Sequence, residues 1–197
     1  MLVLIKGAGD LATGTAVRLY RAGIKVVMTE VARPTAVRRT VAFSQCMYDG
    51  AAQVEGIAAR RAEDAGAARR ALERGEVPVL CDPEAAILGE LPFGGVVDAI
   101  LAKRNLGTAI TDAPVVLALG PGFTAGVDCH GVVETMRGHD LGRLLTRGSA
   151  APNTGVPGDV GGYTIQRIIR APADGVFEPL AAIGQRVEEG QPVARVA

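Results

Sequence analysis

The first residues whose types and spacing could do chemistry are two glycines close to the N-terminus. Gly7 and Gly9 follow an apolar run and precede a helical pattern, with Ala12 three positions further on. Glycines at this spacing permit a tight turn and let a ligand approach the backbone N–H groups at the start of the helix. Glu30 follows after about 20 residues, where a dinucleotide-binding motif places the acid that contacts ribose. The pattern therefore predicts a turn that binds a nucleotide or a related cofactor.

One acidic residue in this turn argues against a pyrophosphate ligand. Asp10 follows Gly9 directly and is expected at the N-cap of the helix. Its carboxylate would accept the free N–H groups there and would repel a phosphate at the same place. Three interpretations stay open: a dinucleotide site, a site for another small ligand or cofactor, and a self-capped unit that binds nothing.

Cationic and amide side chains follow two further predicted strands. Arg38 comes after the second strand, whereas Lys103, Arg104 and Asn105 come after the strand at 95–100. The carboxyl ends of parallel strands form the usual ligand side of an open α/β sheet. Guanidinium, ammonium and amide groups there can hold a phosphate, a carboxylate or an acidic partner. A solvated helix face and an ordinary connection between domains remain the alternatives for these residues.

The cysteines form no metal-binding pattern. Cys46, Cys81 and Cys129 are widely spaced, and no zinc-ligand spacing occurs among them in the sequence. Cys46 and Cys81 are predicted to be small core residues. Cys129 stands beside His130, but a packed cysteine is favoured over a reactive thiol. We therefore predict no metal site and a reducing compartment.

Alternating strands and helices are needed to position these groups. Apolar runs predict strands at residues 2–5, 25–29, 53–58, 78–81 and 95–98. Helical patterns cover residues 10–21, 34–47 and 64–74. Such alternation indicates parallel βαβ units, so we predict an α/β fold class with a Rossmann-like N-terminal domain at residues 1–107.

After residue 107 the pattern changes to short strand candidates separated by Gly-rich turns. The candidate strands cover residues 115–119, 131–135, 141–146 and 163–170. We therefore predict a β-rich second domain at residues 108–197.

The composition excludes several classes of partner. Hydrophobic residues make up 48% of the 197 residues and charged residues 21%, as in folded globular proteins. Lys plus Arg and Asp plus Glu both number 21, so no net charge attracts nucleic acid or an anionic membrane. The N-terminus runs straight into a strand, without the pattern of a signal peptide or a membrane span. We expect a cytoplasmic protein with neither a nucleic acid nor a membrane as partner.

Several motifs together resemble the YqeB family. In chain order they are KGAGDLATG (6–14), VMTE (27–30), RRTVAF (38–43), AKRN (102–105), GPGFTAG (120–126), RGHDLGR (137–143) and NTGVPG (153–158). The resemblance covers almost the whole chain in the same order. A more distant similarity links the chain to accessory proteins of xanthine dehydrogenase maturation, which carry a Rossmann-like domain.

The resemblance implies an accessory protein in the maturation or assembly of a selenium-dependent molybdenum hydroxylase. The implied partners are that enzyme or its maturation factors, and the implied ligand is a nucleotide or a molybdopterin-like compound. The family supplies no catalytic residues to transfer. The site residues predicted here are therefore those of the local arguments: Gly7, Gly9, Asp10, Glu30, Arg38, Lys103, Arg104 and Asn105.

The C-terminal segment resembles the first half of a biotinyl/lipoyl-like sandwich. Family members imply a second half, which this sequence does not contain, and no lysine follows Lys103 to carry biotin or lipoate. A half-sandwich leaves strand edges open. We therefore expect a homo-oligomer in which a second copy covers these edges.

Two other functions remain open at this point. An NAD(P)-dependent oxidoreductase would transfer hydride and bind a dinucleotide tightly, although the sequence offers no convincing proton donor near the turn. A purely structural assembly module would bind no small ligand and would form an oligomer that is indifferent to nucleotides.

Overall fold

The structure is a computed structural model and describes residues 1–156 and 158–197. It forms two compact units, Met1–Asn153 and Thr154–Ala197, which are described separately. Pro157, part of the last motif of the family resemblance, lies outside the described residues.

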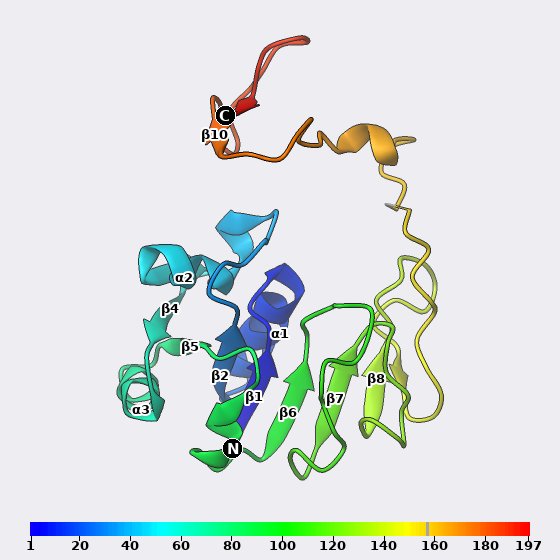
Figure 1. Cartoon of the computed structure of the whole chain (residues 1–197). Helices are drawn as coiled ribbons and strands as arrows, with labels where there is room; N and C mark the ends of the chain where they lie inside the picture. Colours follow the sequence, from blue (N-terminus) through cyan, green and yellow to red (C-terminus); the bar gives the residue numbers. More distant parts are fainter. Residues whose placement is uncertain (157) are drawn as a thin grey trace. The chain divides into compact units, whose positions relative to one another are not determined.

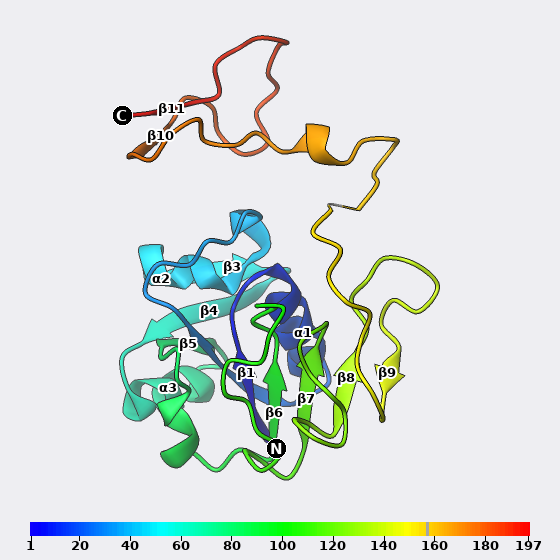
Figure 2. The same cartoon turned by 45° about the vertical axis from the view of Figure 1, so that its right-hand side comes forward.

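The first unit is built on one nine-stranded sheet with the order β3-β4-β5-β2-β1-β6-β7-β8-β9 (Figure 1). In chain order the strands are β1 (Leu2–Lys6), β2 (Lys25–Glu30), β3 (Ala51–Val54), β4 (Ile57–Ala62), β5 (Val77–Cys81), β6 (Gly95–Asp98), β7 (Val116–Leu119), β8 (Gly131–Val133) and β9 (Leu144–Leu145). The pairs β3/β4 and β8/β9 are antiparallel, and Figure 2 shows β9 beside β8. The other neighbours pair in parallel. The unit therefore has a mixed α/β fold with a large, mostly parallel sheet.

Helices connect several of these strands. They are α1 (Asp10–Arg21), α2 (Cys46–Asp49) and α3 (Ala65–Glu73), with short 3-10 turns η1 (Arg39–Val41), η2 (Phe43–Gln45) and η3 (Ala86–Gly89). The predicted helices at 10–21 and 64–74 are confirmed, as are the strands predicted at 2–5, 25–29, 78–81 and 95–98.

Both faces of the central strands are buried, and alternate side chains of each strand point to opposite sides. On β1, Val3 and Ile5 belong to the apolar cluster that includes residues of α1, whereas Leu4 belongs to the cluster that includes residues of α3. The neighbouring strand β2 repeats this alternation. The two helices thus cover opposite faces of the central strands, and the ends of those strands remain available for a site.

Glycines flank helix α1 at both ends. Gly9 is the N-cap residue, with an extended backbone. At the other end Gly23 takes a φ of +77°, and its N–H donates to the Tyr20 carbonyl while the Ile24 N–H donates to the Leu19 carbonyl. These bonds satisfy carbonyls that the helix leaves unpaired at its C-terminus. Local signals therefore fix the helix that follows the Gly turn.

The predicted single helix at 34–47 is wrong. The segment instead consists of η1, η2 and the short α2. The backbone N–H of Phe43 donates to Thr13 Oγ1 (2.8 Å), and that of Ser44 donates to the Ala8 carbonyl (2.8 Å). These bonds hold the segment against the start of α1 and replace the bonds of a continuous helix.

The predicted single strand at 53–58 is a hairpin. Strands β3 and β4 meet at Glu55 and Gly56, which have φ values of 50° and 80°. Two successive residues with positive φ are typical of a tight hairpin turn. Without an Asn-Gly or Asp-Gly pair, the sequence gives only a weak signal for this turn.

The predicted boundary at residue 107 differs from the division of the structure. Strand β7 lies beyond that boundary, yet it pairs in parallel with β6 and extends the same sheet. The hydrogen bonds of the sheet and its shared core therefore continue to β9, and the first compact unit ends at Asn153.

The second unit contains little regular structure. Its elements are η4 (Ile165–Arg167) and the antiparallel strands β10 (Phe177–Pro179) and β11 (Ala194–Val196). The strand predicted at 163–170 is wrong, because the chain makes the η4 turn there. Among the described residues of this unit no side chain is buried.

Across residues 1–156 and 158–197, none of the helices combines the length and the apolar character that crossing a membrane requires.

Candidate functional site

The loops that follow β1, β6 and β7 meet at the carboxyl edge of the sheet. A Cβ built at Gly7 would lie 3.0 Å from the Ala99 carbonyl oxygen in the loop after β6. A Cβ at Gly122, in the loop after β7, would lie 2.6 Å from Arg104 Cα. Only glycine permits such backbone contacts, and φ values of +92° and +109° also require it at these two positions. The loop after β6 is thus held between two glycines.

Glu30 closes the Gly turn from the neighbouring strand. Its Oε2 accepts the Ala8 N–H (3.0 Å) and its Oε1 accepts the Val31 N–H (2.8 Å). The Gly7 N–H donates to the Thr29 carbonyl of the same strand. Each carboxylate oxygen keeps further acceptor capacity, which a ligand hydroxyl group could use.

Asp10 does not cap the helix, contrary to the prediction. The N-cap residue is Gly9, and the cap has no side-chain hydrogen bond. Asp10 is the first residue of α1, and its carboxylate forms an ion pair with Arg38 instead. The guanidinium offsets the negative charge that was expected to repel a phosphate. The structure therefore brings together Asp10 and Arg38, two of the predicted site residues.

The start of α1 is open at Gly9. Its φ of −64° is accessible to any residue. In the part of the chain that the structure describes, no heavy atom outside residues 8–10 lies within 4 Å of a Cβ built there. Neither backbone conformation nor packing inside the chain therefore requires glycine at this position, in contrast to Gly7.

The loop after β6 carries two exposed cations and an unusual backbone. Lys103 and Arg104 are both exposed. Leu101 and Lys103 have φ values of 60° and 64°, which are uncommon for residues with a Cβ and are found disproportionately at functional sites. The loop thus presents its positive charges from a constrained backbone.

Asn105, predicted as part of an oxyanion site, stabilises this loop internally. Its Oδ1 accepts the N–H groups of Gly107 (2.9 Å) and Thr108 (2.8 Å), and its Nδ2 donates to the Thr108 carbonyl (2.8 Å). Most of its hydrogen-bonding capacity is therefore used in the turn.

A buried polar cluster under the Gly turn was missed by the sequence interpretation. Lys6 ends β1, Asp98 ends β6, and both side chains are buried with Thr108. Lys6 Nζ donates to Thr108 Oγ1 (2.7 Å), and that hydroxyl donates to Asp98 Oδ2 (2.6 Å). Two apolar runs that each end in a charged residue are a usable signal for such a cluster, but the sequence does not show that their strands are neighbours.

The cysteines differ in accessibility. Cys46 and Cys129 are buried, as expected, and Cys81 is exposed at the carboxyl end of β5, which corrects its predicted place in the core. Burial raises the pKa of the Cys46 thiol to about 11 and also raises the pKa of Cys129. Within the described residues, no group of three potential His, Cys, Asp or Glu ligands could hold a metal ion.

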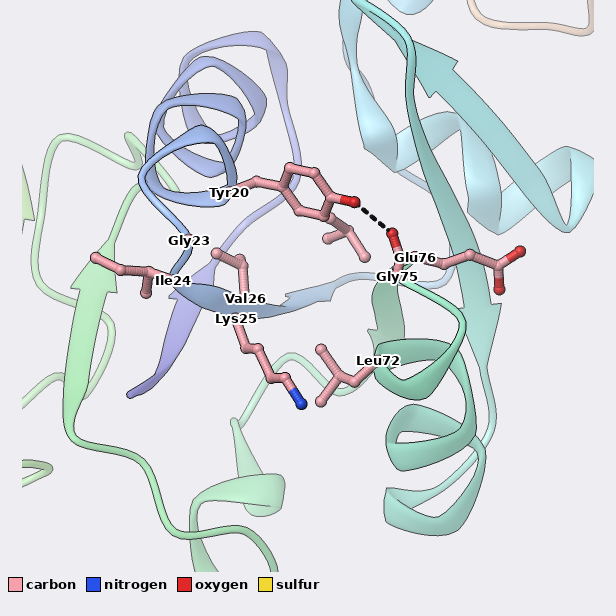
Figure 3. A pocket seen from close by; sticks show the side chains of 9 residues that line it. Tyr20, Gly23, Ile24, Lys25, Val26, Leu72, Gly75 and Glu76 are labelled. Atoms are coloured by element: carbon pink, nitrogen blue, oxygen red, sulfur yellow. Dashed lines mark hydrogen bonds between the residues drawn. The ribbon is translucent and has the colours of Figure 1, made fainter.

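One cavity lies at the opposite, amino edge of the sheet. It has a volume of about 310 Å³ and lies between the ends of α1 and α3 (Figure 3). Tyr20 donates from α1 to the Gly75 carbonyl (2.8 Å), and Glu76 is held by Arg60 and Arg74. The Tyr20–Gly75 bond joins the two helix ends, so we assign this region to the scaffold rather than to the Gly turn.

The fold and the turn define an α/β protein with a glycine-rich turn at the carboxyl edge of a mostly parallel sheet. The chain is similar to the uncharacterized protein YqeB of Escherichia coli (strain K12), with 54% identity over 193 residues. This similarity covers 98% of the chain and supports the resemblance to the YqeB family.

The chain spans 36% of the length of that relative. None of the protein-family models matches the chain. No solved structure matches it either.

Proposed function

We propose that the chain is an accessory protein in the maturation or assembly of a selenium-dependent molybdenum hydroxylase. In this role it binds a nucleotide or a molybdopterin-like ligand at the turn formed by residues 7–10. The family resemblance suggests the process, and the geometry of the turn supports the ligand site.

The place of the turn in the sheet supports a ligand there. Strands β2 and β5 lie on one side of β1, and β6 pairs with its other side, so the strand order reverses at β1. In open α/β sheets, ligands bind outside the carboxyl ends of the strands where the strand order reverses in this way. The loops after β1 and β6 lie at that point. On this basis we infer a Rossmann-like arrangement for the central strands.

The observation that carries the proposal is the open glycine at the start of α1. Nothing described within the chain requires Gly9, whereas a side chain there would obstruct a ligand approaching the helix N-terminus. The first N–H groups of a helix have no partner within the helix, and here no side chain caps them. These groups would bind ligand oxygens.

Charged residues around the turn fit an anionic ligand. Arg38 offsets the charge of Asp10, and Lys103 and Arg104 stay exposed in the adjacent loop. Glu30 would accept a hydroxyl from the sugar or side chain of the ligand while it holds the Ala8 N–H. Asn105 would act indirectly by maintaining the loop.

A thermal-shift panel tests this site. The purified chain would be mixed with saturating NAD, NADP, ATP, CTP, AMP, GTP or a molybdopterin-containing extract. A ligand at about 100 times its Kd stabilises the folded state by roughly 2.7 kcal/mol, equivalent to a rise in Tm of roughly 5–10 °C at this chain length. We expect such a rise with one nucleotide or with the pterin fraction, and its loss in Gly9→Val.

The panel also separates the alternatives. A shift with NAD or NADP alone, together with hydride transfer to a substrate, would support an oxidoreductase instead. The absence of any shift while the protein is folded would contradict ligand binding and favour the structural assembly module.

The second unit supports the proposed homo-oligomer. A two-stranded sheet has only marginal stability on its own. Large apolar side chains such as Phe177 (65% exposed) and Ile169 (81% exposed) lie on the surface of this unit. We expect a dimer or larger assembly in sedimentation velocity at micromolar concentration. A monomer that keeps the same melting temperature on dilution would contradict this part of the proposal.

A further inference from the structure

A second concave surface lies beside α1. It encloses about 230 Å³ and is lined by residues of α1, of the segment at 40–41 and of the β3–β4 hairpin. The residues are Asp10, Thr13, Gly14, Val17, Thr40, Val41, Gln53, Val54 and Glu55. We name this surface the α1 cavity. It touches the Gly turn only through Asp10.

Gly14 is the unexplained residue of this cavity. It occupies the interior of α1, where glycine is less favourable than alanine because it loses more backbone freedom on folding. It is exposed, and its φ is not among the positive values of the chain. A Cβ built at Gly14 would have no heavy atom of another described segment within 4 Å. The packing of the chain therefore gives no reason for a glycine here, whereas a ligand lying flat on the helix would.

Two ion pairs form the rim of the cavity. Asp10 pairs through Oδ2 with Arg38, and Glu55 pairs through Oε2 with Arg21 (2.7 Å). For the second oxygen of each carboxylate, Asp10 Oδ1 and Glu55 Oε1, no hydrogen bond is found within the residues that the structure describes. The rim thus offers charge-neutral ion pairs that still present acceptor oxygens.

The remaining lining is mixed in character. Val17, Val41 and Val54 are the apolar residues of the lining, and Thr40 and Gln53 add polar groups. Small-molecule sites typically combine apolar walls with a few polar groups that fix orientation. Apolar side chains with carboxylate oxygens at the rim suit a planar ring that carries N–H donors on its edge.

We propose that the α1 cavity is a second small-molecule site, which binds a neutral planar heterocycle with adjacent N–H donors, as guanine has. The ring lies over Gly14, and its N–H donors bond the free oxygen of Asp10 or Glu55. The site takes no phosphate, because its cations are already paired with carboxylates. It therefore differs in ligand class from the anion site proposed at Gly9, with which it shares Asp10.

Guanosine serves as the probe, because it presents the donor edge without a phosphate group. Isothermal titration of the full chain is expected to give one site with a Kd on the order of 100 µM or lower, within the range for a ligand of this size. Inosine lacks the exocyclic amine of guanosine, so we expect it to bind about 5-fold more weakly.

Variants of α1 locate the binding. Gly14→Leu fills the cavity with a side chain that favours helix, so it should fold and weaken guanosine binding at least about 10-fold. Arg18→Leu, an exposed change on the same helix outside the cavity, is the matched control and should bind as the wild type does.

Several results would overturn the proposal. The site is not the α1 cavity if guanosine binds Gly14→Leu as well as it binds the wild type. Absence of heat and of a melting shift at millimolar guanosine, in the folded wild type, would remove the proposed ligand class. Guanosine binding that Arg18→Leu weakens as much as Gly14→Leu does would also overturn the proposal, because the loss would then not be specific to the cavity.

Discussion

Replacing Thr108 by valine removes one hydroxyl from the buried Lys6–Thr108–Asp98 cluster and changes little else in shape. That hydroxyl accepts from Lys6 Nζ at 2.7 Å and donates to Asp98 Oδ2 at 2.6 Å, with all three side chains buried. A hydrogen bond to a charged group contributes about 1.5–3 kcal/mol, and this hydroxyl makes two of them. We therefore expect Thr108→Val to lower the free energy of unfolding by about 3–5 kcal/mol.

Urea denaturation monitored by circular dichroism measures this change. For a chain of this length the same loss corresponds to a fall in Tm of roughly 10 °C. Thr108→Ser is the matched control, because it keeps the hydroxyl and should cost only about 1 kcal/mol for the lost methyl group. A Thr108→Val protein within about 1 kcal/mol of the wild type would refute the bridging role that we assign to the hydroxyl.

Further predictions concern the pH dependence, the Gly turn and the thiols. Backbone N–H groups, first that of Ala151, lower the pKa of Glu134. The stability that Glu134 contributes to the folded state should therefore be complete above the unfolded pKa of about 4.3 and should disappear as the pH falls further. In matched urea titrations, Glu134→Gln should cost about 1–3 kcal/mol at pH 7 and less at pH 3. Gly7→Ala should lower stability by about 1–3 kcal/mol in the same assay, because a Cβ meets the backbone after β6 at a positive φ, and an unchanged midpoint would contradict this contact. Ellman's reagent should modify Cys81 rapidly in the native protein and the other thiols only after unfolding, whereas rapid reaction of three thiols would contradict their burial.

The sequence predicts the parts of the fold that local patterns determine. β1 is a continuous apolar run, and α1 is a helical pattern between the Gly turn and Gly23, so the bounds of both are close to the predicted ones. The segment at 34–47 was mispredicted because its conformation depends on hydrogen bonds to residues of the Gly turn and α1. Tertiary contacts of this kind override local helix propensity.

The candidate site likewise combines features that local patterns predict with features that depend on the whole fold. The glycine spacing located the turn, but the role of Asp10 depends on an ion pair with Arg38, which no local pattern indicates. The Lys6–Asp98 pairing depends on the neighbouring positions of β1 and β6 in the sheet. Strand order of this kind is a property of the whole fold, so the sequence alone could not predict the buried cluster.

The central claim is that a ligand binds at the open start of α1, and one comparison tests it most directly. The Kd of the ligand that gives the largest shift in the panel would be measured for the wild type, Gly9→Val and Gly89→Val by isothermal titration. Gly89 is a suitable control because it is exposed and, like Gly9, has open space around a built Cβ among the described residues. We predict that Gly9→Val binds at least about 100-fold more weakly while Gly89→Val binds normally, as expected when a side chain blocks contact with the helix N-terminus. Equal affinity of the three proteins would contradict the site proposed here.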